Sequence, residues 1–222
     1  MSSTQIVTNE GRQALIEYLR NSAVDPQTKK LFIKKFKLIK NESATATQVR
    51  TLAELNDKLI FGRNGVAGPL DVPATFNITS RLNSSSNRLQ LVMSVPIAFS
   101  TGEDPANNIT AVAIVLETDV NYAITAVNAG SKVFTIAGEY ASTFTVSSVL
   151  DIQGSTGNDG EYTVASAIES GGNTLITVNE TVPDSTADGD LSKLLLLAYT
   201  VYTEPFNKAA NSDLTIRTSI QF

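Results

Sequence analysis

Hydrophobic residues fill nearly every position of two segments, residues 109–116 and residues 194–199, so neither side of the extended chain would be polar. Strands of this kind are buried on both faces of a sheet. Residues 214–221 instead alternate apolar and polar side chains, as a half-buried strand does. The pattern predicts two buried partner strands and a last strand that runs almost to residue 222.

Apolar residues three and four positions apart predict two N-terminal helices. The first follows Thr8 and Asn9, either of which can cap a helix, and places Ala14, Leu15, Tyr18 and Leu19 on one side. The second covers residues 47–60. Between them, residues 33–39 alternate in two-residue steps, and this favours a strand with a basic flank.

Two alternating runs between residues 74 and 99, separated by the polar residues 83–87, predict a hairpin. Residues 61–69 are rich in glycine and indicate a connector. A phosphate-binding loop needs a preceding strand and a following helix. Here a helix precedes and prolines follow, so this interpretation is rejected.

The pattern changes after residue 125. Short strands at residues 133–136, 144–152, 162–168 and 175–178 alternate with glycine-containing turns, which is typical of a small antiparallel barrel or sandwich. Asp159 and Gly160 favour a tight hairpin turn. Residues 126–190 contain one lysine and nine acidic residues. We therefore expect a compact acidic insert, with the host sheet resuming directly after it.

Together these elements predict an α+β fold that is mainly β. N-terminal helices pack on an antiparallel, β-sandwich-like sheet, and a small all-β, barrel-like domain is inserted into it. The attachment domain comprises residues 1–125 and 191–222, and the insert comprises residues 126–190.

The composition narrows the chemistry. The chain has no cysteine and no histidine, which excludes thiolate nucleophiles, thiolate metal sites and imidazole acid–base catalysis. Carboxylate pairs for glycoside hydrolysis remain possible, but with 22 acidic residues such pairs arise by chance. We expect a protein that is not an enzyme and has no cofactor.

Charge is divided along the chain. Residues 1–63 hold 11 lysines and arginines and 6 acidic residues, whereas residues 64–222 hold 6 and 16. Such a division can serve nucleic-acid contact or the packing of one copy's basic end on another's acidic end. We favour the second, and name Lys34, Lys35, Lys37 and Lys40 as candidates for an electrostatic partner contact. For the lysine-rich strand itself we favour a solvated or edge face protected by lysines, and docking on an acidic partner is the other interpretation.

Asp184, Asp188 and Asp190 lie in one loop, which we interpret as a solvated turn. The alternative is a site for a cation such as calcium, but the spacing differs from that of known calcium loops. No apolar run approaches the roughly 18 residues that span a bilayer, and the N-terminus lacks an export signal. We therefore expect synthesis in the cytoplasm and no membrane insertion. No arginine cluster or repeated aromatic platform supports base recognition, so we also expect no nucleic-acid binding.

Several segments resemble one protein family. Residues 6–15 (IVTNEGRQAL) resemble the start of the N-terminal domain of bacteriophage tail-collar fibre proteins, and residues 33–39 resemble the strand that follows there. Residues 195–199 (LLLAY), with Pro205, Lys208 and residues 214–216, resemble the place where that domain closes its sheet. Residues 151–165 are similar to a small β module found in phage tail and baseplate proteins.

The resemblance implies attachment to a phage baseplate or tail, as a trimer, with a fibre and a receptor-binding tip downstream. Because this chain stops as the sheet closes, we expect a baseplate or tail-fibre adaptor in the virion whose partners are other tail or baseplate proteins and copies of itself. The alternative is a host-surface polysaccharide-binding module, in which the insert offers Phe134, Tyr140, Phe144 and Tyr162 as stacking platforms.

Overall fold

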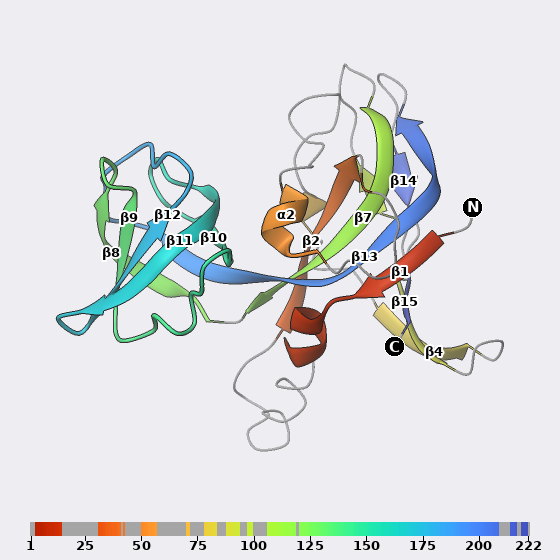
Figure 1. Cartoon of the computed structure of the whole chain (residues 1–222), viewed down its shortest axis with the longest axis horizontal. Coiled ribbons are helices and arrows are strands. Elements are labelled where there is room, and N and C mark those ends of the chain that lie inside the picture. The colour runs from red at the N-terminus through yellow and green to blue at the C-terminus, as the bar shows by residue number, and fades with distance from the viewer. Residues whose placement is uncertain are drawn as a thin grey trace.

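The structure is a computed structural model of the chain. It describes residues 3–14, 31–40, 42, 50–56, 70–71, 78–83, 88–93, 97–99, 106–118, 120–208, 214–216 and 219–221. These residues are mainly β, with short helical segments, which confirms the predicted balance of secondary structure (Figure 1). The predicted connector at residues 61–69 lies outside the described residues.

Three long antiparallel strands form the centre of the fold: β2 (Leu31–Lys40), β7 (Ala106–Thr118) and β13 (Asp190–Lys208). Strand β7 lies between the other two and pairs Val112 with Thr200. The predicted pairing of residues 109–116 with residues 194–199 is therefore confirmed. On the far side of β2 lies the short strand β3 (Leu70–Asp71). We call this part of the fold the core sheet.

Strand β1 (Ser3–Val7) pairs with the opposite edge of β13, with Val7 opposite Ala198. The sequence pattern does not predict this strand. Its apolar residues Ile6 and Val7 are adjacent and show no clear alternation. The strand is defined instead by the edge of β13, against which its backbone groups are paired.

The core sheet is buried on both faces. Residues Ile109 to Leu116 are at most 8 % exposed, as their uninterrupted apolar pattern predicts. One face forms a cluster with α2 (Leu52–Asn56), and its members come from β1, β2, α2, β7, β10 and β13: Ile6, Ile39, Leu52, Leu55, Ala111, Ala113, Val115, Val149, Leu194, Leu196, Tyr199 and Val201. Burial on this scale supplies most of the driving force for folding.

The first helical segment begins after Thr8 and covers residues 9–14 within the described part of the chain. The Thr8 hydroxyl oxygen accepts a 2.9 Å hydrogen bond from the Gly11 amide, so Thr8 caps the helix as predicted. The Thr8 amide in turn donates to the Leu197 carbonyl of β13 at 3.1 Å. Residues 15–20 of the predicted helix lie outside the described residues.

The second helical segment, α2, is five residues long and lies within the predicted range of 47–60. Thr51 and Glu54 form a capping box: the Thr51 amide donates to the Glu54 carboxylate at 2.8 Å, and the Glu54 amide donates to the Thr51 hydroxyl at 3.3 Å. Residues 47–49 and 57–60 lie outside the described part.

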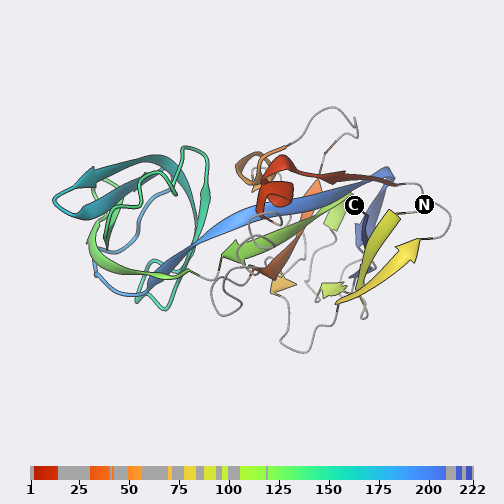
Figure 2. The same cartoon turned by 90° about the horizontal axis from the view of Figure 1, so that it is seen from below.

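A ring of strands lies between β7 and β13 in the chain. In spatial order its members are β8 (Tyr122–Asn128), β9 (Val133–Ala137), β12 (Asn173–Val178), β11 (Gly160–Ser170) and β10 (Val149–Gln153). The first residues of β13 pair with β8 on one side and with β10 on the other, and this closes the ring (Figure 2). We call this ring the barrel.

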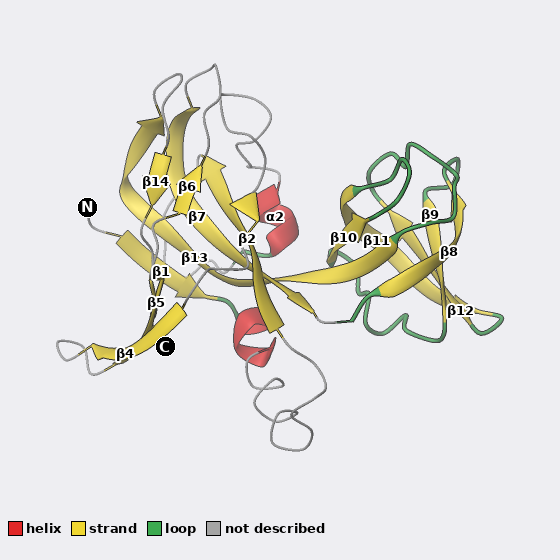
Figure 3. Ribbon diagram, turned by 180° about the vertical axis from the view of Figure 1, so that it is seen from behind, coloured by secondary structure: helices red, strands yellow, loops and turns green. Residues whose placement is uncertain are grey.

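The barrel has its own apolar core, separate from that of the core sheet. Its buried members are Ile124, Phe134, Ile136, Phe144, Leu150, Ile152, Tyr162, Val164, Ile176, Val178, Val182 and Leu191. The alternating burial along β9 and β12 matches the two-residue periodicity of their sequences. Strand β13 continues from the barrel into the core sheet without a break (Figure 3).

Two predictions about the barrel were wrong. Gly160 pairs with Ile152 at the start of β11, so the tight turn expected at Asp159 and Gly160 is a longer loop. The strand expected at residues 144–152 begins only at Val149, because residues 141–148 form turns and loops. The tight turn lies instead at Gly171 and Gly172, whose φ angles of 60° and 78° suit glycine.

The predicted hairpin at residues 74–99 is confirmed: β4 (Ile78–Asn83) pairs with β5 (Arg88–Met93). The single strand predicted at residues 214–221 is wrong, since two short strands occur there. Strand β14 (Leu214–Ile216) pairs with β6 (Ile97–Phe99), and β15 (Ser219–Gln221) pairs with β5.

Candidate functional site

The lysine-rich strand β2 lies inside the fold. Lys35 pairs with Val115 of β7 and Lys37 pairs with Ala113, so both lysines project from the face that carries the apolar cluster. Lys35 is 7 % exposed and Lys37 is fully buried. The solvated face considered for this strand is therefore wrong for these two residues.

The barrel supplies the counter-charges. The Lys35 ammonium lies 2.8 Å from Asp151 Oδ1 and 3.2 Å from Glu161 Oε1, and the Lys37 ammonium contacts Glu161 Oε2. Asp151 and Glu161 are directly opposite one another on β10 and β11. Two neighbouring strands thus present a pair of carboxylates to two lysines that are two positions apart on β2.

Asn56, the last residue of α2, completes this cluster. The Lys37 ammonium donates a 2.7 Å hydrogen bond to Asn56 Oδ1. Asn56 Nδ2 donates at 3.2 Å to Glu161 Oε2, the same oxygen that contacts Lys37. Lysine, amide and carboxylate therefore contact one another in all three pairings. We call Lys35, Lys37, Asn56, Asp151 and Glu161 the junction cluster.

Burial and charge act differently on the two lysines. For Lys37, burial lowers the pKa of the ammonium below 10.5, and the attraction of Glu161 does not restore it. For Lys35, burial also acts to lower the pKa, but Glu161 and Asp151 outweigh it and the pKa is raised. Lys37 is thus the amine whose neutral form is the more accessible.

The carboxylate of Glu161 is held in its charged form. Burial acts to raise its pKa, but the ammonium groups of Lys37 and Lys35 outweigh burial and lower the pKa below 4.5. A buried carboxylate between two amines can accept and return a proton without leaving its place.

The remaining candidate lysines lie nearer the surface. Lys34 forms a 2.9 Å ion pair with Glu117 of β7, and Lys40 is half-buried at the end of β2. Three of the four candidate lysines therefore pair with acidic residues of their own chain. The positive charges of these three lysines are therefore paired with acidic residues from later in the same chain.

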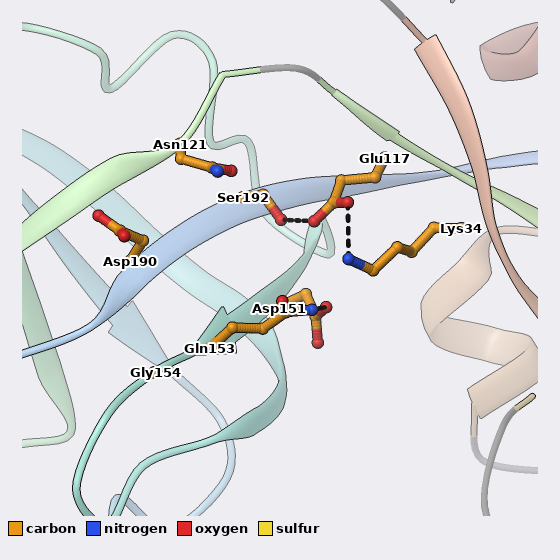
Figure 4. Close-up of a pocket in the computed structure, with 8 residues that line it drawn as sticks. All are labelled: Lys34, Glu117, Asn121, Asp151, Gln153, Gly154, Asp190 and Ser192. Carbon is orange, nitrogen blue, oxygen red and sulfur yellow. Dashed lines mark hydrogen bonds and ion pairs between the residues drawn. The ribbon is translucent and has the colours of Figure 1, made fainter. Parts of the chain in front are cut away.

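A polar cavity of about 280 Å³ lies beside the junction cluster (Figure 4). It is lined by Lys34, Glu117, Asn121, Asp151, Gln153, Gly154, Asp190 and Ser192. Glu117 accepts a 2.6 Å hydrogen bond from the Ser192 hydroxyl, and Asp151 accepts one of 2.6 Å from the Gln153 amide. These carboxylates are thus engaged by neighbouring side chains.

The loop with Asp184, Asp188 and Asp190 is organised by hydrogen bonds. Asp188 accepts from the Ser155 hydroxyl at 2.9 Å and from the Thr156 amide at 3.0 Å, which joins the loop after β10 to the loop before β13. Hydrogen bonds from the Thr156 hydroxyl, the Thr156 amide and the Ser155 hydroxyl lower the pKa of Asp188. Asp184 accepts from the Thr186 amide, and Asp190 begins β13. Within the described residues, no group of three or more acidic side chains is placed to hold a metal ion.

The four aromatic residues considered for sugar stacking differ in exposure. Phe134, Phe144 and Tyr162 belong to the core of the barrel. Tyr140 is 39 % exposed, and its ring meets that of Tyr122 edge-on with centroids 4.8 Å apart. Of these four, Tyr140 alone is exposed enough to offer part of a ring to a ligand.

Among the described residues, no helix is both long and apolar enough to cross a membrane.

The junction cluster was not predicted as a group. Its members come from four elements, and the only sequence signal was the unusual alternation of lysine with large apolar residues in residues 33–39.

Comparison of the chain with protein-family models, with curated proteins and with solved structures finds no significant match to any of them.

Proposed function

We propose that this protein is a structural component of a bacteriophage tail, a baseplate or tail-fibre adaptor that docks fibre to baseplate through protein–protein contacts. It acts in the virion, as a trimer of identical chains, together with other tail or baseplate proteins. Its role is to hold neighbours in place, and it neither turns over a substrate nor requires a cofactor.

The observation that carries the proposal is the agreement between the tail-collar resemblance and the order of elements. Residues 6–15, which resemble the opening of that domain, include the capped helical segment. Residues 33–39 fall within β2, and residues 195–199 fall in the part of β13 that pairs with β7. Each of these three segments takes a place in the core sheet or against it, whereas residues 214–216, which belong to the same resemblance, form β14 and pair with β6.

The division into two domains is part of the same proposal. The core sheet, with its helical segments, is the attachment domain, and the barrel is the inserted domain. The ring of strands begins at Tyr122 and closes on Leu194, a few residues beyond the proposed limits of 126 and 190 at each end. Separate apolar cores support two units.

Docking would use the surface charges that remain after the internal ion pairs are formed. Lys40 is the candidate on β2, and Glu139, Asp159 and Glu169 are exposed on the barrel. A specific contact of this kind buries about 1,000 Å² or more. Electrostatic attraction between such faces weakens as the Debye length falls from about 10 Å at 0.1 M salt to about 3 Å at 1 M.

Localisation in the particle tests the function directly. Antibodies against the chain should label the tail of purified particles of the encoding phage, and a map of that particle should contain the core sheet at the baseplate. Purified virions that lack the chain would overturn the proposal. Sedimentation of the purified chain at low and high salt tests the charge contact: association that is equally strong in both excludes it.

The exposed ring of Tyr140 favours a second candidate, binding of a host-surface polysaccharide by the barrel. Exposed aromatic rings provide the flat apolar surface on which sugars stack. A glycan array probed with the full chain and with Tyr140→Ala distinguishes the two functions. Binding that disappears in the variant supports the polysaccharide function, whereas silence of the full chain leaves the adaptor function.

A further inference from the structure

Three side chains of the junction cluster have the relationship that amide-bond formation requires. Lys37 offers an amine, Asn56 offers a carboxamide, and Glu161 offers a carboxylate that contacts both. They come from β2, α2 and β11, so the fold brings together groups that are up to 124 positions apart in the chain. An ion pair between Lys37 and Glu161 needs no third group, yet the Asn56 carboxamide contacts both side chains.

Lys37 has the surroundings of a nucleophilic amine. Its side chain is fully buried beside Ala113 and the apolar cluster. An amine attacks a carbonyl only when it has lost its proton, and burial favours that neutral form. The lowered pKa of Lys37 agrees with its position.

Asn56 presents its carboxamide to that amine. The Lys37 nitrogen lies 2.7 Å from Asn56 Oδ1. The carbonyl carbon Cγ lies only about 1.2 Å beyond that oxygen, the length of a C=O bond. A small rotation of the amide brings the nitrogen and the carbon to the separation of about 3–3.5 Å from which reaction proceeds.

Glu161 contacts both the attacking and the departing nitrogen through one oxygen, Oε2. The ammonium of Lys35 holds the other oxygen, Oε1, at 3.2 Å. Glu161 can therefore take a proton from Lys37 and deliver it to Asn56 Nδ2 without rearrangement, as a general base and then a general acid.

We propose that Lys37 and Asn56 become joined by an intramolecular isopeptide bond, with Glu161 as the catalytic proton carrier. The Lys37 ammonium gives a proton to Glu161, and the neutral amine attacks Asn56 Cγ. The C–N bond to Nδ2 breaks as Glu161 returns the proton to that nitrogen. The Lys37 nitrogen loses its second proton to the released ammonia, which leaves as an ammonium ion. One C–N bond replaces another, so no oxidant, reductant or co-reactant is needed.

The bond would fasten β2 to the end of α2 and close a covalent loop between residues 37 and 56, which also contains the ion pair between Glu42 and Arg50. It is a single self-modification of the chain and converts no external substrate. The inference does not depend on the proposed tail function, because it rests only on contacts within one chain.

Mass spectrometry of the purified full chain tests the proposal. The intact chain should be lighter than its sequence by one ammonia molecule. Trypsin should release a branched peptide in which residues 36–40 are joined through Lys37 to residues 51–58 through Asn56, since an acylated lysine is not cleaved. A mixture of both masses whose lighter fraction yields this peptide also supports the proposal.

Single variants assign the roles. Lys37→Met, Asn56→Ala and Glu161→Gln should each abolish the branched peptide. Lys34→Met is the matched control, because Lys34 is on the same strand but pairs with Glu117, and it should retain the branched peptide. Circular dichroism identifies any variant that fails to fold. The mass and the branched peptide of the wild-type chain test the proposal independently of the variants.

Three results would overturn the proposal. The first is a wild-type chain of full mass with no branched peptide after prolonged incubation. The second is loss of ammonia without a branched peptide, as succinimide formation at an asparagine would give. The third is a branched peptide formed through Lys35. Any of these would leave the junction cluster as a set of ion pairs and hydrogen bonds.

Discussion

Lys35 of β2 and Asp151 of β10, which are 116 positions apart in the chain, form an ion pair 2.8 Å long. Both side chains are almost fully buried, at 9 % and 3 % exposure. A buried ion pair gains little net stability over a well-packed apolar pair, but it strongly disfavours arrangements that separate its charges. The pair therefore fixes how the barrel meets the core sheet.

Removal of one charge from this pair should be costly. We expect Lys35→Met to lower the free energy of unfolding by about 3–5 kcal/mol, because Asp151 is left buried without its main counter-charge. Urea denaturation measures the change. Lys34→Met, which breaks the more exposed pair with Glu117, should cost at most about 1 kcal/mol. Equal losses in the two variants would contradict this prediction.

The pH dependence of stability should report on Glu161. Its folded pKa lies below 4.5, so the unfolded chain takes up a proton at this carboxylate first as pH falls. The contribution of Glu161 is fully present above about pH 4.5 and is lost as pH falls through the folded pKa.

Urea denaturation between neutral and acidic pH checks the sign. The unfolding free energy of the wild type should fall more steeply below pH 4.5 than that of Glu161→Gln, whose side chain does not titrate. Parallel profiles for the two proteins would show that Glu161 has an ordinary pKa in the folded chain.

Gly11 lies where the first helical segment crosses β13. A Cβ atom at this position would lie 2.7 Å from Leu197 Cα, which is backbone and cannot move aside alone. We expect Gly11→Ala to lower the free energy of unfolding by about 1–3 kcal/mol. Gly130→Ala is the control, since its nearest atom is 3.6 Å away, and it should change stability by no more than about 0.5 kcal/mol.

Phe134 tests whether the barrel has a core of its own. Phe134→Ala should cost about 3–5 kcal/mol, because the ring is fully buried among the residues of that core. Hydrogen exchange should accelerate at the amides of β9 and β12 more than at those of β7. Val146→Ala, at a position 68 % exposed, should alter neither. Equal acceleration in β7 would mean that the two cores unfold together.

The sequence was most informative where burial is complete. Residues 109–116 and 194–199 have no polar face, and their burial can be predicted without knowing which segment each one pairs with. Thr8 was predicted as a possible cap because capping depends on a hydrogen bond to an amide three residues away. Such local relationships can be recognised in a single sequence.

The junction cluster could not be predicted because its relationships are spatial. Lys37 alternates with apolar residues, as a lysine on an exposed strand face also would. Its burial depends on the ion pair with Glu161, which comes from a distant part of the chain. Asn56 carries no signal at the end of a short helix. Gly160 misled the prediction because its φ of 146° serves the start of a strand rather than a tight turn.

The 19-residue strand β13 belongs to both cores, since Leu191 is buried in the barrel and Leu196 in the core sheet. Successive side chains of a strand point in opposite directions, so the side-chain alternation in the barrel part of β13 sets the alternation in the core-sheet part. A single residue inserted between Leu191 and Leu196 would turn every inward side chain outward in one of them. A shared strand of this kind couples the evolution of the two parts: their lengths can change in surface loops, but along this strand an odd number of added residues needs a β-bulge such as the one between Leu196 and Ala198.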